Sequence, residues 1–133
     1  MTLATQSADG PWAAALFYVY VGDDLVFLSN PSSRHSRDLA CEPRCAATIQ
    51  DQERDWRDIR GLQVEGIAGL LNGNERERAR RAYAKRFPFV EAMGASVSIA
   101  EALAHAQWYR LRMARLLFID NSRGFGWRQE FFS

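Results

Sequence analysis

Short apolar segments separated by tight turns run through the first part of the chain and predict β-strands. Residues 2–6 have the length and composition of a short strand, and residues 8–10 (Ala-Asp-Gly) are typical of a turn. Residues 12–21 form a longer apolar run, which predicts a second strand buried on both faces. Residues 22–24 (Gly-Asp-Asp) then predict a hairpin turn into a strand over residues 25–28. The opening is therefore expected to be a β-meander.

The middle of the chain alternates between a short helix and further strands. Ser32 or Ser33 is suited to cap a helix that runs to about residue 41. Residues 44–50 are strand-like, and residues 59–71 predict a long strand with glycines at positions 61, 66 and 69. Glycines inside a strand mark bends or bulges where a sheet curls, so this pattern favours a barrel.

Residues 74–87 carry the clearest helical pattern. Asn74 is expected to cap this helix, Glu77 follows three residues later as in a capping box, and Pro88 comes just after the end. An apolar stripe at helical spacing predicts the face that packs inward, and it consists of Ala79, Ala82, Tyr83 and Phe87.

The end of the chain predicts a second short helix near residues 98–104 and more strands. Residues 107–113 and 116–121 read as two final strands or as one bent strand. The total is six or seven strands with two or three small helices and no linker. We therefore expect a mainly β protein, an antiparallel split barrel that occupies residues 1–133 as a single domain.

Composition and charge exclude several classes of partner. The 17 basic and 16 acidic residues give a net charge of +1, which provides no field to hold a nucleic-acid backbone. The arginine-rich helix over residues 74–87 is interpreted as a solvated face, because Glu75 and Glu77 offset part of its charge. No apolar run is long enough for a membrane-spanning helix, and no secretory signal is recognised. We expect a cytoplasmic protein without membrane or nucleic-acid partners. Cys41 and Cys45 do not have zinc-site spacing and are expected to be reduced thiols, so no metal site is predicted.

The segment over residues 25–37 is the strongest candidate for binding chemistry. A strand delivers Ser29 to the edge of the sheet, a serine-rich turn follows, and Arg34 lies in the first turn of the next helix. Hydroxyl groups, free backbone N–H groups and a guanidinium together suit a phosphate. The same serines could simply cap the helix. His35 could be a phosphate donor, a general acid or base, or an ordinary helix residue. No catalytic pair or nucleotide-binding fingerprint is evident, as in enzymes whose cofactor does the chemistry.

Several motifs resemble one known family. Val26-Phe27-Leu28-Ser29-Asn30-x-x-Ser33-Arg34-His35 resembles the FMN-phosphate segment of pyridoxamine 5′-phosphate oxidases. Three later motifs are similar to a small, largely uncharacterised bacterial branch of the FMN-binding split-barrel group. They are Arg60-Gly61-Leu62-Gln63-Val64-x-Gly66, Ala82-Tyr83-x-x-Arg86-Phe87-Pro88 and Asp120-Asn121-x-x-Gly124-Phe125-Gly126. Together the resemblance covers about residues 10–127.

The resemblance implies a homodimer that holds two FMN molecules in clefts between its subunits. The isoalloxazine ring would be lined, through backbone groups, by Ala14, Ala15, Leu16 and Phe17. The ribityl-phosphate would be bound by Leu28, Ser29, Ser33, Arg34 and His35. Gly61 and Gln63 would approach the flavin from the partner chain.

Two departures from the oxidase pattern predict weaker FMN binding. His35 stands where the oxidase has lysine, and Ala13 stands where it has a flavin-facing arginine. The substrate-binding residues of the oxidase's C-terminus have no counterpart, which argues against pyridoxamine phosphate oxidation. Three hypotheses remain. The first is a flavin-dependent oxidoreductase of unknown substrate and unknown catalytic residues, reduced by a nicotinamide cofactor or another donor. The second is a binding module for FMN, haem (with His35 or His105 as ligand) or another planar molecule. The third is a structural dimer that has lost its ligand.

Overall fold

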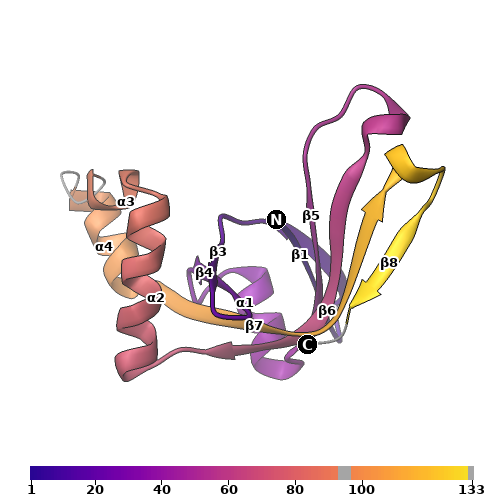
Figure 1. The fold of residues 1–133 in the computed structure, drawn as a ribbon. Coiled ribbons are helices and arrows are strands. Elements are labelled where there is room, and N and C mark those ends of the chain that lie inside the picture. The colour runs from indigo at the N-terminus through magenta and orange to yellow at the C-terminus, as the bar shows by residue number, and fades with distance from the viewer. Residues whose placement is uncertain (93–96, 132–133) are drawn as a thin grey trace.

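One curled antiparallel sheet makes up most of the molecule, and its strand order is β2-β1-β5-β6-β7-β4-β3, with β8 added beside β7 (Figure 1). The computed structural model describes residues 1–92 and 97–131. The strands are β1 (Thr2–Ser7), β2 (Gly10–Ala15), β3 (Val19–Val21), β4 (Asp24–Ser29), β5 (Arg44–Gln50), β6 (Arg60–Leu70), β7 (Gln107–Asp120) and β8 (Arg128–Phe131). The predicted mainly β, antiparallel barrel is confirmed, with one strand more than expected.

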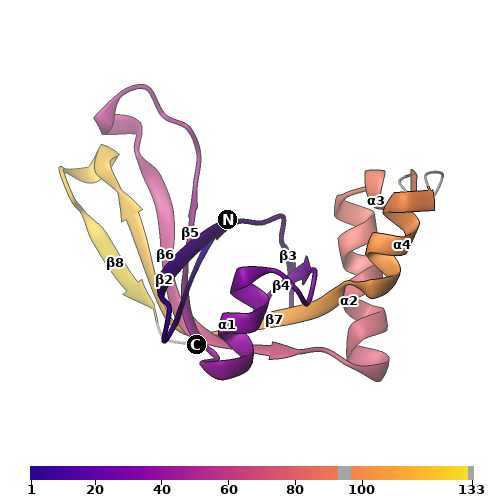
Figure 2. The ribbon, with the colours of Figure 1, turned by 180° about the vertical axis from the view of Figure 1, so that it is seen from behind.

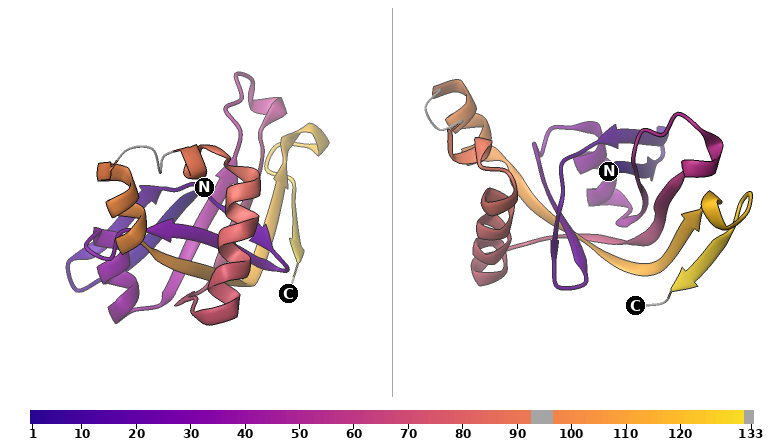
Figure 3. Two further views of the ribbon diagram at one scale, coloured as in Figure 1. Left: turned by 90° about the vertical axis from the view of Figure 1, so that its left-hand side faces the viewer. Right: turned by 45° about the horizontal axis from the view of Figure 1, so that its top comes forward.

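Helices cover two parts of this sheet. They are α1 (Arg34–Cys41), α2 (Gly73–Arg86), α3 (Phe89–Ala92) and α4 (Val97–His105), together with the short 3₁₀ helices η1 (Trp56–Asp58) and η3 (Asn121–Arg123). Helix α1 lies against β1 and β2, whereas α2 lies across β3 and β4 (Figures 2 and 3). Within the described residues, no helix is long and apolar enough to span a membrane.

The predicted strand over residues 12–21 is wrong in two respects. It is divided into β2 and β3, which form opposite edges of the sheet, and residues 16–18 carry the chain from one edge to the other. It is also not buried on both faces, since Trp12 is 46% exposed and Tyr20 is 44% exposed. The strand with two buried faces is β4, because Leu25 and Phe27 point into the barrel while Val26 packs under α2. We call residues 16–18 the seam of the barrel.

The core fills the inside of the curled sheet. Leu3, Phe27, Val64 and Leu111, from four different strands, are almost completely buried in one cluster. Leu39 of α1 packs into the same cluster, so α1 closes one side of the barrel. Burying side chains of this size stabilises the fold by about 1.5–3 kcal/mol each.

Helix α2 uses the predicted apolar stripe but not the predicted cap. Ala79 and Tyr83 are buried against Val26 and Trp108, as the stripe requires. The helix begins at Gly73, which has a φ of 54°, so Asn72 rather than Asn74 takes the capping position. A glycine tolerates this left-handed conformation without steric cost.

The long strands β6 and β7 pair side by side and bend together. Residues 107–120 form one bent strand, the second of the two predicted alternatives. Glu65 pairs with Arg115 and Gly66 with Met113, so Ala114 is the extra residue of a bulge. Beyond this bend, one end of β5, β6 and β7, together with β8, extends away from the barrel (Figure 1). We call this extension the arm; sequence analysis did not predict β8 within it.

Candidate functional site

Three serines and a histidine form a buried polar cluster where β4 meets α1. Ser29 ends β4, and Ser33 is the N-cap of α1, with its hydroxyl accepting a hydrogen bond from the Ser36 backbone N–H. Nε2 of His35 lies 2.5 Å from Oγ of Ser29 and 3.2 Å from Oγ of Ser33. The Ser36 hydroxyl joins them, at 3.1 Å from Ser29 and 2.9 Å from Ser33. We call these four side chains the hydroxyl cluster.

The hydroxyl cluster is electrically neutral and adaptable. Burial lowers the pKa of His35, and the nearby Asp38 carboxylate only partly opposes this effect. A neutral imidazole donates from one nitrogen and accepts at the other, and each hydroxyl rotates to donate or accept. The first N–H groups of α1 add donors at the same place, because the first turn of a helix leaves them without intrahelical partners. This donor set fits a phosphate group, which only accepts hydrogen bonds at pH 7.

Arg34 is part of a clamp that joins α1 to the first two strands. Its Nε donates to Oδ1 of Asp38 at 2.9 Å, and one terminal nitrogen donates to the Gly10 carbonyl at 3.1 Å. Its guanidinium also lies 5.5 Å from the ring centre of Trp12. The side chain remains 23% exposed, so these contacts do not enclose it completely. Arg34 is therefore held by three partners in this chain, and its binding to a phosphate stays a prediction.

Asp38 holds the clamp from inside the protein. The residue is buried, and the Thr5 hydroxyl donates to its Oδ2 at 2.9 Å. Burial alone would raise the pKa of this carboxyl, but hydrogen bonds from Arg34, Thr5 and Ser7 and the charge of Arg34 lower it overall. Sequence analysis missed Asp38, Thr5 and Trp12. The four-residue spacing between Arg34 and Asp38 on one helix was the signal that could have revealed the ion pair.

The residues predicted to line a flavin ring lie on β2 and the seam. Ala14 and Ala15 end β2, and the backbone of Leu16 exchanges two hydrogen bonds of 2.9 Å with Met1. Phe17 is 61% exposed, and its ring centre lies 5.2 Å from that of Phe87. β3 begins at Val19, opposite Val26, so the seam leaves the sheet at the end where β4 reaches Leu28 and Ser29. The nine residues predicted for the flavin ring and the ribityl-phosphate therefore lie on β2, the seam, the end of β4 and the start of α1.

The last two predicted residues lie elsewhere. Gly61 and Gln63 pair with Ile119 and Leu117 near the C-terminal end of β7, whereas Ser29 pairs with Gln107 at the strand's first residue. Measured along the chain, ten residues of strand amount to about 33 Å at roughly 3.3 Å per residue, and the bend at Ala114 makes the direct distance shorter. A single chain therefore does not bring Gly61 and Gln63 to the hydroxyl cluster.

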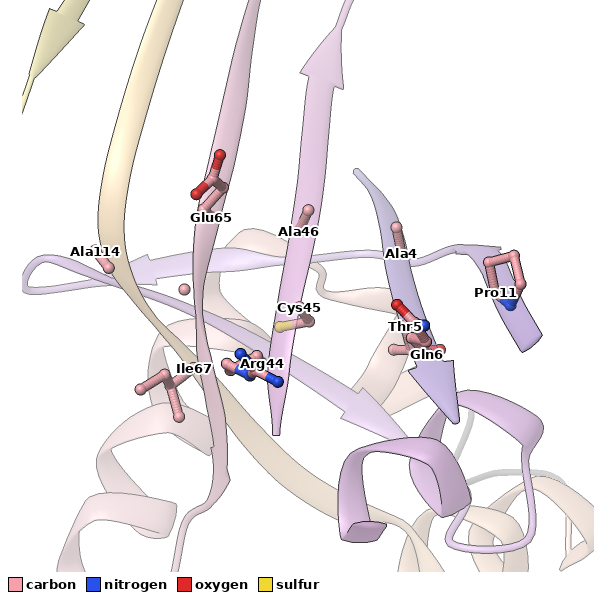
Figure 4. Close-up of a pocket in the computed structure, with 11 residues that line it drawn as sticks. Ala4, Thr5, Gln6, Pro11, Arg44, Cys45, Ala46, Glu65, Ile67 and Ala114 are labelled. Atoms are coloured by element: carbon pink, nitrogen blue, oxygen red, sulfur yellow. The ribbon is translucent and has the colours of Figure 1, made fainter. Parts of the chain in front are cut away.

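A shallow groove of about 520 Å³ lies on the outer face of the sheet and contains none of the eleven predicted site residues (Figure 4). Ala4, Cys45, Ala46 and Ile67 contribute much of its apolar lining. No group of three or more His, Cys, Asp or Glu side chains suited to a metal ion occurs within residues 1–92 and 97–131. His105, the second histidine, is exposed at the end of α4.

Comparison with known proteins places this geometry in context. Residues 1–120 match the family model described as pyridoxamine 5′-phosphate oxidase. A UPF0306 protein of Klebsiella pneumoniae is 32% identical over 136 residues, which cover 98% of this chain and 85% of that protein. UPF0306 protein YhbP of Escherichia coli is 30% identical over 128 residues, covering 95% of this chain and 80% of that protein.

Three solved structures share the fold. A heme binding protein of Mycobacterium smegmatis superposes with a TM-score of 0.77 at 24% identity, over 98% of this chain but only 51% of that protein. The heme storage protein HutZ of Vibrio cholerae has a TM-score of 0.68 at 18% identity, covering 84% of this chain and 79% of HutZ. A FAD-binding protein of Mesorhizobium loti has a TM-score of 0.64 at 16% identity, covering 86% and 78%. Likeness at these identities shows the fold alone.

Proposed function

The chain belongs to the pyridoxamine 5′-phosphate oxidase family, and we propose that it binds FMN with the phosphate at the hydroxyl cluster and acts as a flavin-dependent oxidoreductase. The observation that carries this proposal is the donor set itself. Three hydroxyl groups and one imidazole are joined by five contacts of 2.5–3.2 Å at the start of a helix. Such a concentration of groups able to donate is suited to a phosphate.

Each part of the site has a separate task in this proposal. The hydroxyl cluster and the exposed edge of Arg34 bind the phosphate, while Asp38 fixes the orientation of Arg34. The backbone of Ala14–Phe17 follows the ring system, and Phe17 excludes water from one side of it. A bound FMN would supply the electron-transfer chemistry, since no acid–base pair is evident in the described residues. A nicotinamide cofactor as electron donor, a homodimeric assembly and a cytoplasmic location belong to the same proposal.

Haem is the second candidate ligand, because two proteins of the same fold are described as heme-binding or heme-storing. The side chains favour the flavin. Nε2 of His35 faces the hydroxyls of Ser29 and Ser33 rather than an open apolar cavity. Iron ligation by His35 would require that nitrogen to leave both partners, at a cost of about 1 kcal/mol for each lost hydrogen bond.

The first test compares FMN with riboflavin, which lacks the phosphate. The purified protein is titrated with each flavin while fluorescence quenching is recorded, using the wild type, Ser29→Ala and Ser32→Ala. Ser32 lies in the same turn but is exposed and bonded to Asn30, so it serves as the matched control. We expect the wild type and Ser32→Ala to prefer FMN, and Ser29→Ala to bind FMN at least tenfold more weakly, which corresponds to about 1.4 kcal/mol.

The outcomes separate the three hypotheses. Equal affinity for FMN and riboflavin would reject the phosphate site. Bleaching of the flavin absorbance by NADH or NADPH without oxygen supports an oxidoreductase, whereas a flavin that no donor reduces supports a binding module. A sharp Soret band with haem, together with no FMN binding, would show that the ligand is haem and not a flavin. Binding of neither ligand would leave the barrel as a structural dimer.

A further inference from the structure

The end of helix α2 brings a guanidinium to the seam of the barrel. Tyr83 is buried beneath the helix, and its ring centre lies 4.9 Å from that of Phe87, the residue that ends the helix. Arg86 lies between them in sequence and is exposed in the last turn. Its guanidinium carbon lies 5.1 Å from the ring centre of Tyr18 and 5.4 Å from that of Phe87. The side chain of Arg86 is therefore directed toward the seam.

Arg86 differs from neighbouring arginines of α2 in the kind of partner it has. Arg80 and Arg81 both pair with the carboxylate of Glu77. Among the described residues, no carboxylate forms an ion pair with Arg86, whose contacts are with aromatic rings. Contacts of this kind hold a guanidinium in place without neutralising it. The positive charge therefore remains available to a negatively charged group at the seam.

The charge of Arg86 acts on groups at both ends of the seam. Burial, and then the charge of Arg86, lower the pKa of the Met1 amino group, which donates to the Leu16 carbonyl at 2.9 Å. Burial and the neighbouring Tyr18 raise the pKa of the Tyr20 hydroxyl, and the charge of Arg86 opposes that rise. These effects agree with the ring contacts in placing a positive charge beside the seam.

We infer that Arg86 stabilises the reduced, negatively charged form of the flavin ring at the seam and so raises the reduction potential of bound FMN. The inference rests on the proposed function for the presence of FMN. It adds to that site a residue of α2, a helix that provides none of the eleven residues predicted from the sequence.

Reduction by a nicotinamide donor changes the charge of the ring. The hydride carries two electrons and one proton; its C–H bond in the donor breaks, a bond to N5 of the ring forms, and the donor leaves as an oxidised nicotinamide. The ring then carries one negative charge, which is spread over N1 and the C2 oxygen. A nearby cation favours the charged form of a group over its neutral form. Arg86 is thus expected to bind the reduced ring more strongly than the oxidised ring.

The proposed placement of FMN directs the polar edge of the ring toward Arg86. Backbone groups of residues 14–17 can hydrogen-bond only to the edge that carries N1, N3 and the two carbonyl oxygens, because the opposite edge carries methyl groups. Phe17 ends this stretch, and its ring lies 5.2 Å from that of Phe87, over which Arg86 lies. Arg34 contacts Gly10 and Trp12 near the start of the same stretch. The two arginines therefore serve different parts of FMN, Arg34 the phosphate and Arg86 the ring.

The test compares the affinities for oxidised and reduced FMN. Fluorescence quenching gives the dissociation constant of oxidised FMN, and an anaerobic redox titration with an indicator dye gives the reduction potential of bound FMN. The variants are Arg86→Gln, Arg86→Lys and Lys85→Gln. Lys85 is the matched control, because it carries the same charge one residue away but lines a groove with Arg80, Arg81 and Pro88. Circular dichroism checks that each variant folds.

We expect Arg86→Gln to reduce the preference for reduced over oxidised FMN at least tenfold, which lowers the two-electron potential by about 30 mV. Arg86→Lys keeps the charge and should recover most of this loss, whereas Lys85→Gln should leave the potential unchanged. Ser29→Ala should weaken the binding of both forms equally, because the charge of the phosphate does not change on reduction.

The outcomes distinguish this inference from the proposed function. Equal potentials in the wild type and Arg86→Gln would overturn the inference and leave FMN binding standing. An equal fall in Lys85→Gln would also overturn it, because the effect would then belong to the overall charge of α2 rather than to Arg86 at the seam. If the wild type binds no FMN, the proposed function and the inference both fail.

Discussion

Replacing Gly66 by alanine tests the bend that separates the barrel from the arm. A Cβ at this position would overlap with the Arg112 carbonyl oxygen and would lie 2.8 Å from Cδ1 of Leu111. The carbonyl belongs to the backbone of β7 and cannot rotate away, so the two strands must move apart. Overpacking of this kind costs about 1–3 kcal/mol. Alanine recovers roughly 0.5–1 kcal/mol of strand propensity, which leaves an expected net loss of about 1 kcal/mol.

Gly69→Ala provides the control for this substitution. Gly69 lies in the same strand, does not have a positive φ, and has no heavy atom within 4 Å of an added Cβ. Alanine there is expected to stabilise the protein by about 0.5 kcal/mol. Urea unfolding followed by circular dichroism gives both free energies, and the melting temperature of Gly66→Ala should fall by roughly 4 °C. If Gly66→Ala were as stable as Gly69→Ala, the close approach of the β7 backbone to Gly66 would be refuted.

Three further predictions concern the site and the thiols. Burial lowers the pKa of His35 below its usual 6.5, so the unfolded chain binds more protons and the free energy of unfolding should fall as the pH drops below about 6.5. Urea unfolding between pH 5 and 8 should show this slope in the wild type and in His105→Gln, but not in His35→Gln. Burial raises the pKa of Cys45 to about 11, so iodoacetamide at pH 8 should label the exposed Cys41 first, as peptide mass spectrometry would show. The double variant Ala13→Arg/His35→Lys restores the oxidase residues and should bind FMN about tenfold more tightly by fluorescence titration, whereas unchanged affinity would mean that these two positions do not face the bound FMN.

The predictions that succeeded depend on local chemistry. Ser33 caps α1 because a serine hydroxyl reaches the N–H three residues later, and that preference is visible in the sequence. The hairpin into β4 and the apolar stripe of α2 follow from turn residues and from helical spacing in the same way. The prediction that a glycine inside a strand marks a bend was also confirmed, since the bulge lies at Gly66.

The predictions that failed depend on partners far away in the chain. Residues 12–21 are apolar throughout, so nothing in their pattern shows that the chain changes from one sheet edge to the other at the seam. Trp12 is 46% exposed within this apolar run, because the covering of a strand's face depends on how distant segments pack rather than on the local pattern. The Arg34 clamp requires Gly10 and Trp12, more than twenty residues earlier, and so could not be derived from the helix alone.

The choice between flavin and haem has to be made by side chains, because proteins of this fold are described as binding either one. A haem site needs a strong ligand directed into open space, and the described part of the chain offers two histidines. One is bonded to two serine hydroxyls and the other is exposed at a helix end. A phosphate needs several hydrogen-bond donors, which the hydroxyl cluster supplies. The replacement of lysine by a buried neutral imidazole therefore weakens the electrostatic part of phosphate binding but retains its hydrogen bonds. For this reason we expect a site that still distinguishes FMN from riboflavin while binding FMN less tightly than a site with a permanent positive charge at position 35.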